Sequence, residues 1–145
     1  MWSLILFGLG MLYTNFLEWS IHKYILHGLG KNKNSRFHFH MVHHMAVSKE
    51  DYSDPTKGIE EEVALFFTGL LHLPLLWISV YFYLGAFFGG ILYYGLHWVG
   101  HKFPPIGRSV FTSHYNHHTY YPNKNWCVTY PLFDLILGSY KKHKG

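Results

Sequence analysis

The sequence has 145 residues, 49% of them hydrophobic and 20% aromatic, which fits one domain over residues 1–145 and is apolar enough to indicate a membrane protein. The net charge of +4 does not indicate a nucleic-acid partner, because the basic residues are scattered beside apolar segments rather than lined along one helix. The single cysteine, Cys127, excludes an internal disulfide.

The stretch from Trp2 to Leu17 is apolar and predicts a helix at the start of the chain. At about 1.5 Å per residue this helix spans only a thin bilayer or enters it obliquely. It has no basic first region, and no small-residue cleavage site precedes His22. We therefore expect it to stay in the mature protein rather than to act as a signal peptide.

His22 and His27 follow this helix and are five residues apart. On a regular α-helix that spacing turns the two side chains well away from each other. The pair therefore predicts local unwinding. Two forms are open: a helix end in which the Gly28-Leu29-Gly30 run adopts the left-handed conformation, or a π-bulge.

Three further histidine clusters have helical spacing. Residues three and four apart share one face of a helix, so each H-x-x-H-H triplet predicts three imidazoles presented to a single point. The pair that is four apart shares a face by the same rule. The clusters are His40, His43 and His44, then His97 and His101, then His114, His117 and His118.

A polar segment, 48–58, contains the turn signal Asp54-Pro55, and three glutamates at 60–62 then fit the first turn of a helix better than a catalytic role. From Val63 to Gly100 there are 38 residues without Lys, Arg, Asp or Glu, enough for two membrane-spanning helices. We predict a helical hairpin over 63–84 and 86–101, with its turn at Gly85 and a kink at Pro74.

The last part of the chain begins where Pro104, Pro105 and Gly107 interrupt the helix after His101. A new helix then carries the last histidine triplet and ends by Pro122. The segment 125–140 predicts either an amphipathic element on the membrane surface or a flap over the histidines.

Ten clustered histidines indicate a metal centre. A tetrahedral ion takes four ligands and an octahedral ion six, so ten donors predict two ions, and imidazole favours iron, zinc, copper or nickel. The isolated histidines, His38, His72 and His143, are expected to be structural or exposed. Partners that accept the free imidazole N–H should orient the ligands. The candidates for this role are Glu18, Asn116, Asn125 and Asp134.

All twelve Lys and Arg residues lie in the segments that carry the histidines or border them. By the positive-inside rule, the histidine side is then cytoplasmic. The hairpin leaves and returns on that side, which brings the clusters of both halves together. The expected fold class is all-α, an integral membrane helical bundle with a cytoplasmic histidine-rich di-metal cap.

The order of the clusters resembles the fatty acid hydroxylase superfamily of membrane di-metal oxygenases, which includes sterol desaturases, fatty acid 2-hydroxylases and carotenoid hydroxylases. Its boxes, H-x4-H, H-x2-H-H, H-x3-H and H-x2-H-H, here read HKYILH, HMVHH, HWVGH and HYNHH. The resemblance extends from Glu18 to Tyr140, and its closing segment matches at Asn125, Pro131, Phe133 and Asp134. Cys127 departs from it, because relatives often have glycine there, and the chain has one apolar segment before the first box where relatives often have more.

The resemblance implies a pair of iron ions, or zinc in the isolated protein, held by the ten histidines, with no catalytic residue beyond the metal ligands. It implies use of O2 to hydroxylate or desaturate an aliphatic C–H bond of a lipid substrate. Electrons would come from a reduced pyridine nucleotide through a separate carrier, such as a b-type cytochrome or a ferredoxin with its reductase, because no haem domain is fused here. The location would be the endoplasmic reticulum of a eukaryote or the inner membrane of a bacterium.

Two other interpretations stay open. The first is a histidine-rich membrane protein that binds metal or haem for electron transfer without oxygenase activity, although haem needs only one histidine pair and leaves the triplets unexplained. The second is a zinc-dependent hydrolase, which would use a water-activating carboxylate as in H-E-x-x-H, a motif that the sequence lacks. Fatty acyl chains, sphingolipids, sterols and carotenoids all remain open as substrates.

Overall fold

The computed structural model describes residues 1–47, 52–56 and 59–143, so part of the polar segment 48–58 lies outside the described residues. Throughout the described part the regular elements are helices, as expected for an all-α protein. In chain order they are α1 (Trp2–Ser20), a π-helix (Ile21–Leu26), a 3-10 helix (Leu29–Lys31), α2 (Phe39–Ala46), α3 (Glu60–Leu71), a 3-10 helix (Leu73–Trp77), α4 (Val80–Lys102), α5 (Pro104–Ser109), α6 (Thr112–Thr119) and α7 (Leu132–Ile136).

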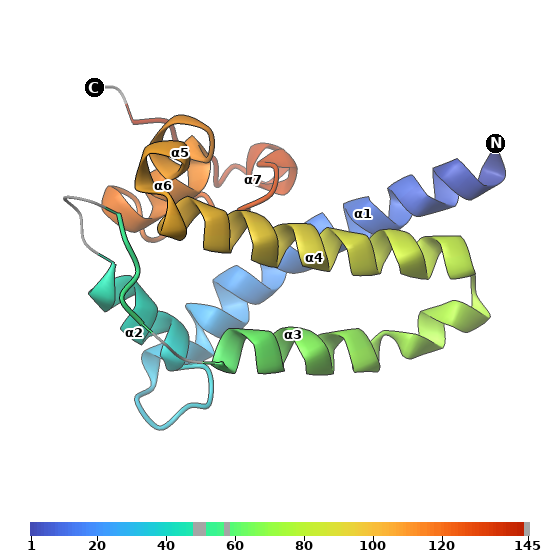
Figure 1. Cartoon of the computed structure of the whole chain (residues 1–145), viewed down its shortest axis with the longest axis horizontal. Helices are drawn as coiled ribbons and strands as arrows, with labels where there is room; N and C mark the ends of the chain where they lie inside the picture. Colours follow the sequence, from blue (N-terminus) through green and yellow to red (C-terminus); the bar gives the residue numbers. More distant parts are fainter. Residues whose placement is uncertain (48–51, 57–58, 144–145) are drawn as a thin grey trace.

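The two longest helices, α1 and α4, pack against each other through small residues (Figure 1). A Cβ atom on Gly85 would lie 2.0 Å from the carbonyl oxygen of Phe7, and one on Gly10 would lie 2.1 Å from that of Phe82. Glycine is therefore needed at these positions so that the two backbones can approach, as small residues allow between membrane helices.

The predicted hairpin turn at Gly85 is wrong, because Gly85 lies inside α4 and serves this helix contact. The turn comes earlier. α3 ends at Leu71, before Pro74, whose ring cannot continue an α-helix, and a 3-10 helix follows. Ser79 then begins α4, its hydroxyl accepting a hydrogen bond from the backbone N–H of Phe82 at 3.3 Å. The expected kink at Pro74 is thus a helix end.

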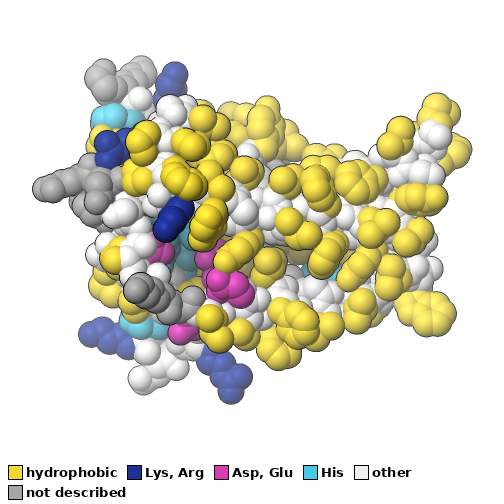
Figure 2. Space-filling view, in the orientation of Figure 1, with side chains coloured by type: hydrophobic (Ala, Val, Ile, Leu, Met, Phe, Trp, Pro, Cys, Tyr) yellow, Lys and Arg dark blue, Asp and Glu magenta, His cyan; other side chains and the backbone are white. Residues whose placement is uncertain are grey.

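Apolar side chains cover the long helices, and the charged side chains gather at the end of the molecule away from the N-terminus (Figure 2). Within the described residues, one helical stretch, 2–31, has the length and composition of a membrane span. The predicted pair of spans in the hairpin does not meet the same test. α3 has only 12 residues, and α4 dilutes its apolar residues with Gly, Tyr and His.

The shorter helices α2, α5 and α6 lie together at the end of the long helices away from the N-terminus (Figure 1). This end carries every histidine cluster, because α2 and α6 hold the two triplets and α4 ends with His97 and His101. The fold thus gathers at one place donors from both halves of the chain.

Candidate metal centre

The first histidine pair lies on a π-helix, one of the two forms predicted from its spacing. The backbone N–H of His27 donates to the carbonyl of His22 at 2.9 Å, a bond between residues five apart. The two rings therefore lie on one side, with centroids 5.1 Å apart. The left-handed glycine alternative is wrong at Gly28, whose φ is −78°, and glycine is required there because a Cβ would collide with the carbonyl of Tyr24.

The structure brings all ten clustered histidines together in two groups of five. Within each group, one nitrogen from every ring lies within 4.8 Å of the others. The first group consists of His22, His27, His40, His44 and His117, and the second of His43, His97, His101, His114 and His118. His38, His72 and His143 belong to neither group, as expected for isolated histidines.

Each H-x-x-H-H triplet is divided between the groups rather than aimed at one point as predicted. On α2, His40 and His44 join the first group and His43 joins the second. On α6, His114 and His118 join the second group and His117 joins the first. The reason is helical geometry: relative to residue i, residues i+3 and i+4 turn to opposite sides. The groups adjoin where the rings of His44 and His118 stack at 4.0 Å.

The spacing of the ring nitrogens fits ligands that share one ion. In the first group, Nε2 of His117 lies 3.1 Å from Nε2 of both His27 and His44, which are 2.9 Å apart. In the second group, Nε2 of His118 lies 3.2 Å from Nε2 of both His43 and His114. Ligands at right angles around an ion with bonds of about 2.1 Å would be about 3.0 Å apart.

In the first group, backbone carbonyls fix the orientation of two rings. The Nδ1–H groups of His22 and His117 donate to the carbonyls of Trp126 and Lys124, both at 2.6 Å. Because a carbonyl can only accept, these neutral rings carry their proton on Nδ1 and direct the Nε2 lone pair into the group.

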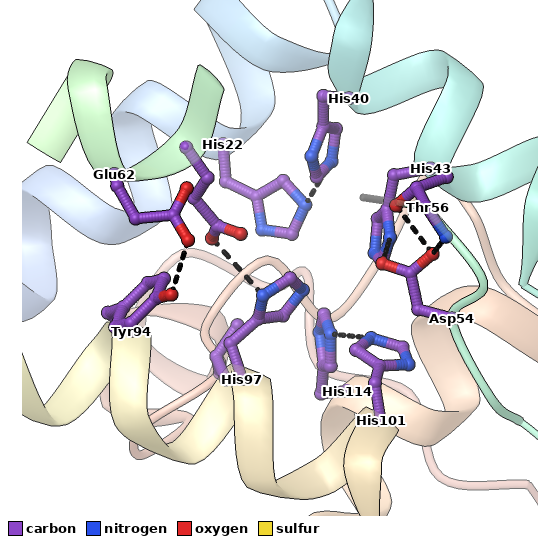
Figure 3. Close-up of polar contacts among 12 residues, drawn as sticks. His22, His40, His43, Asp54, Thr56, Glu62, Tyr94, His97, His101 and His114 are labelled. Atoms are coloured by element: carbon purple, nitrogen blue, oxygen red, sulfur yellow. Dashed lines mark hydrogen bonds and ion pairs between the residues drawn. The ribbon is translucent and has the colours of Figure 1, made fainter. Parts of the chain in front are cut away.

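In the second group, three rings have a partner at Nδ1, and two of these partners are carboxylates (Figure 3). Nδ1 of His43 lies 2.8 Å from Asp54, and Nδ1 of His97 lies 3.1 Å from Glu61. Nδ1 of His101 donates to the carbonyl of Tyr52 at 3.1 Å. Nε2 of His97 is buried and finds no hydrogen-bond partner among the described residues, as expected of a nitrogen meant for a metal ion.

Burial keeps four of the ten rings neutral, whereas at His97 the effect of burial is outweighed by Glu61 and the pKa is raised. Burial lowers the pKa of His40, His114, His117 and His118 well below the usual value, and the neighbouring histidines lower it further. Partial burial raises the pKa of Asp54, but hydrogen bonds from His43 and Thr56 outweigh it, so the net shift is downward. Neutral imidazoles with inward lone pairs are the form that binds transition metals.

The fatty acid hydroxylase family model matches residues 7–139, which is most of the chain. The chain belongs to the fatty acid hydroxylase family. No significant match was found among curated proteins or among solved structures. Membership in this family indicates an oxidoreductase, and the two histidine groups indicate that the protein binds metal.

The four residues predicted to orient the histidines, Glu18, Asn116, Asn125 and Asp134, form no direct hydrogen bond with the histidine rings in the described structure. Asp134 accepts hydrogen bonds from the backbone N–H groups of Trp126 and Cys127 at 2.9 and 2.8 Å. It therefore contacts His22 only indirectly, through Trp126, whose carbonyl accepts from His22. Asn125 exchanges two hydrogen bonds with the backbone of Lys141, at 2.6 and 2.8 Å. Both therefore order the loop whose carbonyls orient His22 and His117.

The other two candidates lie farther from the ligands. Glu18 is buried and accepts hydrogen bonds from the backbone N–H groups of Val128 and Thr129, so it ties α1 to the same loop. Asn116 is buried on α6, and its carbonyl accepts from Tyr120 and Tyr121 at the helix end. Neither contacts a ligand nitrogen in the described structure.

Sequence reasoning missed the direct partners Tyr52, Asp54 and Glu61. The Asp54-Pro55 dipeptide was interpreted only as a turn, and Glu61 only as a helix-end residue. Glu61 is in fact both, because it lies in the first turn of α3 and contacts His97. The one available signal was that Asp54 and Glu61 are acidic residues between the two histidine-rich halves. For Tyr52 there was no signal, because its backbone carbonyl rather than its side chain accepts the hydrogen bond from His101.

Two spaces reach the histidine groups from different sides. An apolar cavity of about 420 Å³ lies between α1, α3 and α4 and reaches His22 and Glu61. A second, polar cavity of about 650 Å³ reaches His40, His43, His97 and His101. Glu61, Glu62 and Tyr94 line both. The hydroxyl of Tyr94 donates to Glu62 at 2.5 Å, which links α4 to α3 between the two spaces (Figure 3).

Proposed function

We propose that this fatty acid hydroxylase family member is a membrane-bound di-iron oxygenase that hydroxylates or desaturates an aliphatic C–H bond of a lipid. The observation that carries the proposal is the apolar cavity between α1, α3 and α4, which reaches His22 of the first five-histidine group, with the second group adjoining the first. The cavity gives an alkyl chain a dry path to the histidines.

The donor set fits iron, because neutral imidazoles with nitrogen spacings of about 3 Å suit a transition metal, and each group of five histidines would hold one ion. Iron bound at such groups supplies activation of O2 at a C–H bond, leading to hydroxylation or to loss of two hydrogens. The chain itself orients the ligands through the Trp126 and Lys124 carbonyls and through Asp54 and Glu61.

The apolar cavity supports the lipid part of the proposal. Its walls come from Leu17 of α1, Ile21 of the π-helix, Leu65 of α3 and Phe87 and Ile91 of α4. Such walls exclude water and hold an alkyl chain by contact area rather than by specific hydrogen bonds. A chain lying there would present a carbon to the histidine groups beside His22.

The apolar surface of the long helices supports placement in a membrane, and the basic residues near the histidines support a cytoplasmic histidine side, at the endoplasmic reticulum or the bacterial inner membrane. The polar cavity beside His43 and His101 is the route that we propose for electrons from a separate carrier, such as a b-type cytochrome or a ferredoxin with its reductase.

A haem or metal-binding protein without oxygenase activity is the second candidate. Haem needs a histidine on each side of a planar macrocycle, whereas here the ligand nitrogens of each group all lie within 4.8 Å of one another and leave no room for one. A protein that only stores metal would have no use for an apolar cavity that reaches its ligands.

The test is oxygen transfer by the purified full-length protein in detergent, with a ferredoxin, its reductase and NADPH. We expect about two iron atoms per chain, as the two histidine groups predict. Incubation with a lipid extract of the producing cells under ¹⁸O2 should yield a lipid that carries ¹⁸O or, for desaturation, one that has lost two hydrogens.

The variants His43→Ala and His117→Ala each remove a ligand from one group and should abolish the product, whereas His143→Ala, outside both groups, should not. A wild-type protein that contains a haem or no transition metal, or a product that persists in both ligand variants, would overturn the proposal.

A further inference from the structure

The apolar cavity has a polar end far from the histidine groups. There the hydroxyl of Tyr13, on α1, lies 2.8 Å from Nε2 of His72, at the end of α3, and both residues line the cavity. Tyr13 precedes His22 by nine residues, which is about 13 Å along a helix. The cavity thus has histidine ligands at one end and an isolated hydrogen-bonding pair at the other.

The direction of each hydrogen bond in this pair is fixed. Nδ1 of His72 lies 2.7 Å from the carbonyl of Thr68, which can only accept, so the proton of the neutral ring is on Nδ1. Nε2 of His72 is then an acceptor, and the Tyr13 hydroxyl must donate its only proton to it. The Tyr13 oxygen is left with lone pairs and no proton to offer.

A ligand atom that meets this end must therefore be a hydrogen-bond donor. A hydroxyl group can donate to the Tyr13 oxygen, whereas an ether, a ketone or an ester can only accept and finds no donor in this pair. Polar atoms that line an otherwise apolar pocket are the groups that fix the orientation and identity of a ligand. A polar pair on a membrane-facing bundle is for the same reason a functional candidate.

We propose that Tyr13 and His72 form a hydroxyl-recognition subsite, so that the substrate is an elongated, mostly apolar alcohol whose hydroxyl lies at the end remote from the reacting carbon. The inference rests on the proposed function, because it names the substrate class of the same cavity. The hydroxyl would donate to the Tyr13 oxygen, and the apolar body would extend along α1 and α4 toward His22.

The test is competition binding to the full-length, metal-loaded protein in detergent without reductant, with tritiated 1-dodecanol as the probe. Its competitors are unlabelled 1-dodecanol and the methyl ether 1-methoxydodecane, which differ in the donor. We expect the wild type to prefer the alcohol by about three- to tenfold, the effect of one hydrogen bond. Comparing variants on this ratio cancels the different partitioning of the two ligands into micelles.

Two variants should remove the preference for opposite reasons. The double variant Tyr13→Phe/His72→Leu has neither acceptor of the pair and should lose affinity for the alcohol, whereas His72→Leu alone frees the Tyr13 proton and should gain affinity for the ether. Tyr83→Phe, on another tyrosine that lines the cavity, should keep the wild-type ratio.

An equal affinity of the wild type for alcohol and ether, or an unchanged preference in the double variant Tyr13→Phe/His72→Leu, would overturn the subsite. Either result with ¹⁸O incorporation intact would leave the proposed function standing. Retained alcohol preference without any oxygenated or desaturated product would instead overturn the proposed function and leave the binding subsite in place.

Discussion

Glu61 lies 3.1 Å from Nδ1 of His97, so α3 supports the second histidine group although it supplies no histidine to it. Asp54 supports His43 of the same group in the same way. The first group has backbone carbonyls in the corresponding places, behind His22 and His117. The two groups thus differ in the charge of their surroundings, and the second is the more negative.

This difference predicts unequal effects of removing a carboxylate. Glu61→Gln should weaken metal binding at the second group by about 10- to 100-fold while leaving the first group unchanged, because the partner of a ligand histidine raises its basicity and fixes its tautomer. Glu60→Gln, an exposed residue in the same helical turn, is the matched control. Metal titration against a competing chelator measures both affinities, and equal weakening in the two variants would contradict the prediction.

Gly107 on α5 predicts a second selective effect. A Cβ there would lie 2.5 Å from the carbonyl oxygen of Gly100 and 2.6 Å from the Tyr52 ring. Gly107→Ala should therefore displace Tyr52, whose carbonyl holds His101, and lower the metal content of the second group. Gly95→Ala, on α4, meets nothing within 4 Å and should retain full content. Metal analysis of the two purified variants decides this, and equal contents would count against the role of Tyr52.

The contact between α1 and α4 predicts a stability effect. Gly85→Ala should destabilise the protein by about 1–3 kcal/mol or more, because the added methyl group overlaps the Phe7 carbonyl and forces the helices apart. Gly8→Ala meets open space and should stabilise α1 by up to about 1 kcal/mol. Thermal unfolding in detergent measures both changes. If Gly85→Ala is as stable as the wild type, the close helix contact is refuted.

At Asn125 the backbone conformation and the side-chain hydrogen bonds should contribute separately to stability. Its φ is +59°, and its side chain makes two hydrogen bonds with the Lys141 backbone. Asn125→Gly should lose those bonds, each worth about 0.5–1.5 kcal/mol. Asn125→Ala should lose about 1–2 kcal/mol more, because alanine disfavours the left-handed region. Unfolding measurements on both variants test the order, and a more stable alanine variant would reverse the argument.

The sequence predicted the residues of the site better than their arrangement. Helical spacing was enough to select all ten histidines that the structure brings together. It did not reveal that each triplet is divided, since that depends on α2 and α6 lying between two groups rather than facing one. The accepting carbonyls of Tyr52, Lys124 and Trp126 could not be predicted, because every residue has a backbone carbonyl and only the fold selects which one faces a histidine.

Glycine was the main source of error in the fold. At Gly85 and Gly28 the sequence was interpreted as conformational freedom, a turn and a left-handed helix end. The structure uses both residues for their lack of a side chain, beside the carbonyls of Phe7 and Tyr24. Sequence alone does not separate these two uses of glycine. Ser79 was the better signal for the start of α4, because its hydroxyl caps the helix.

The π-helix at Ile21–Leu26 ties the number of residues between His22 and His27 to the type of helical turn. A π-turn holds one residue more than an α-turn, so a histidine pair five apart on a π-turn shares one side, as the pair His97 and His101 does four apart on the α-helix α4. Deleting one residue between His22 and His27 would therefore favour an ordinary α-helical turn that still places both rings on one side. Inserting one residue would leave the pair six apart and turn the rings away from each other on either type of helix. The segment thus tolerates loss of its extra residue better than gain of another.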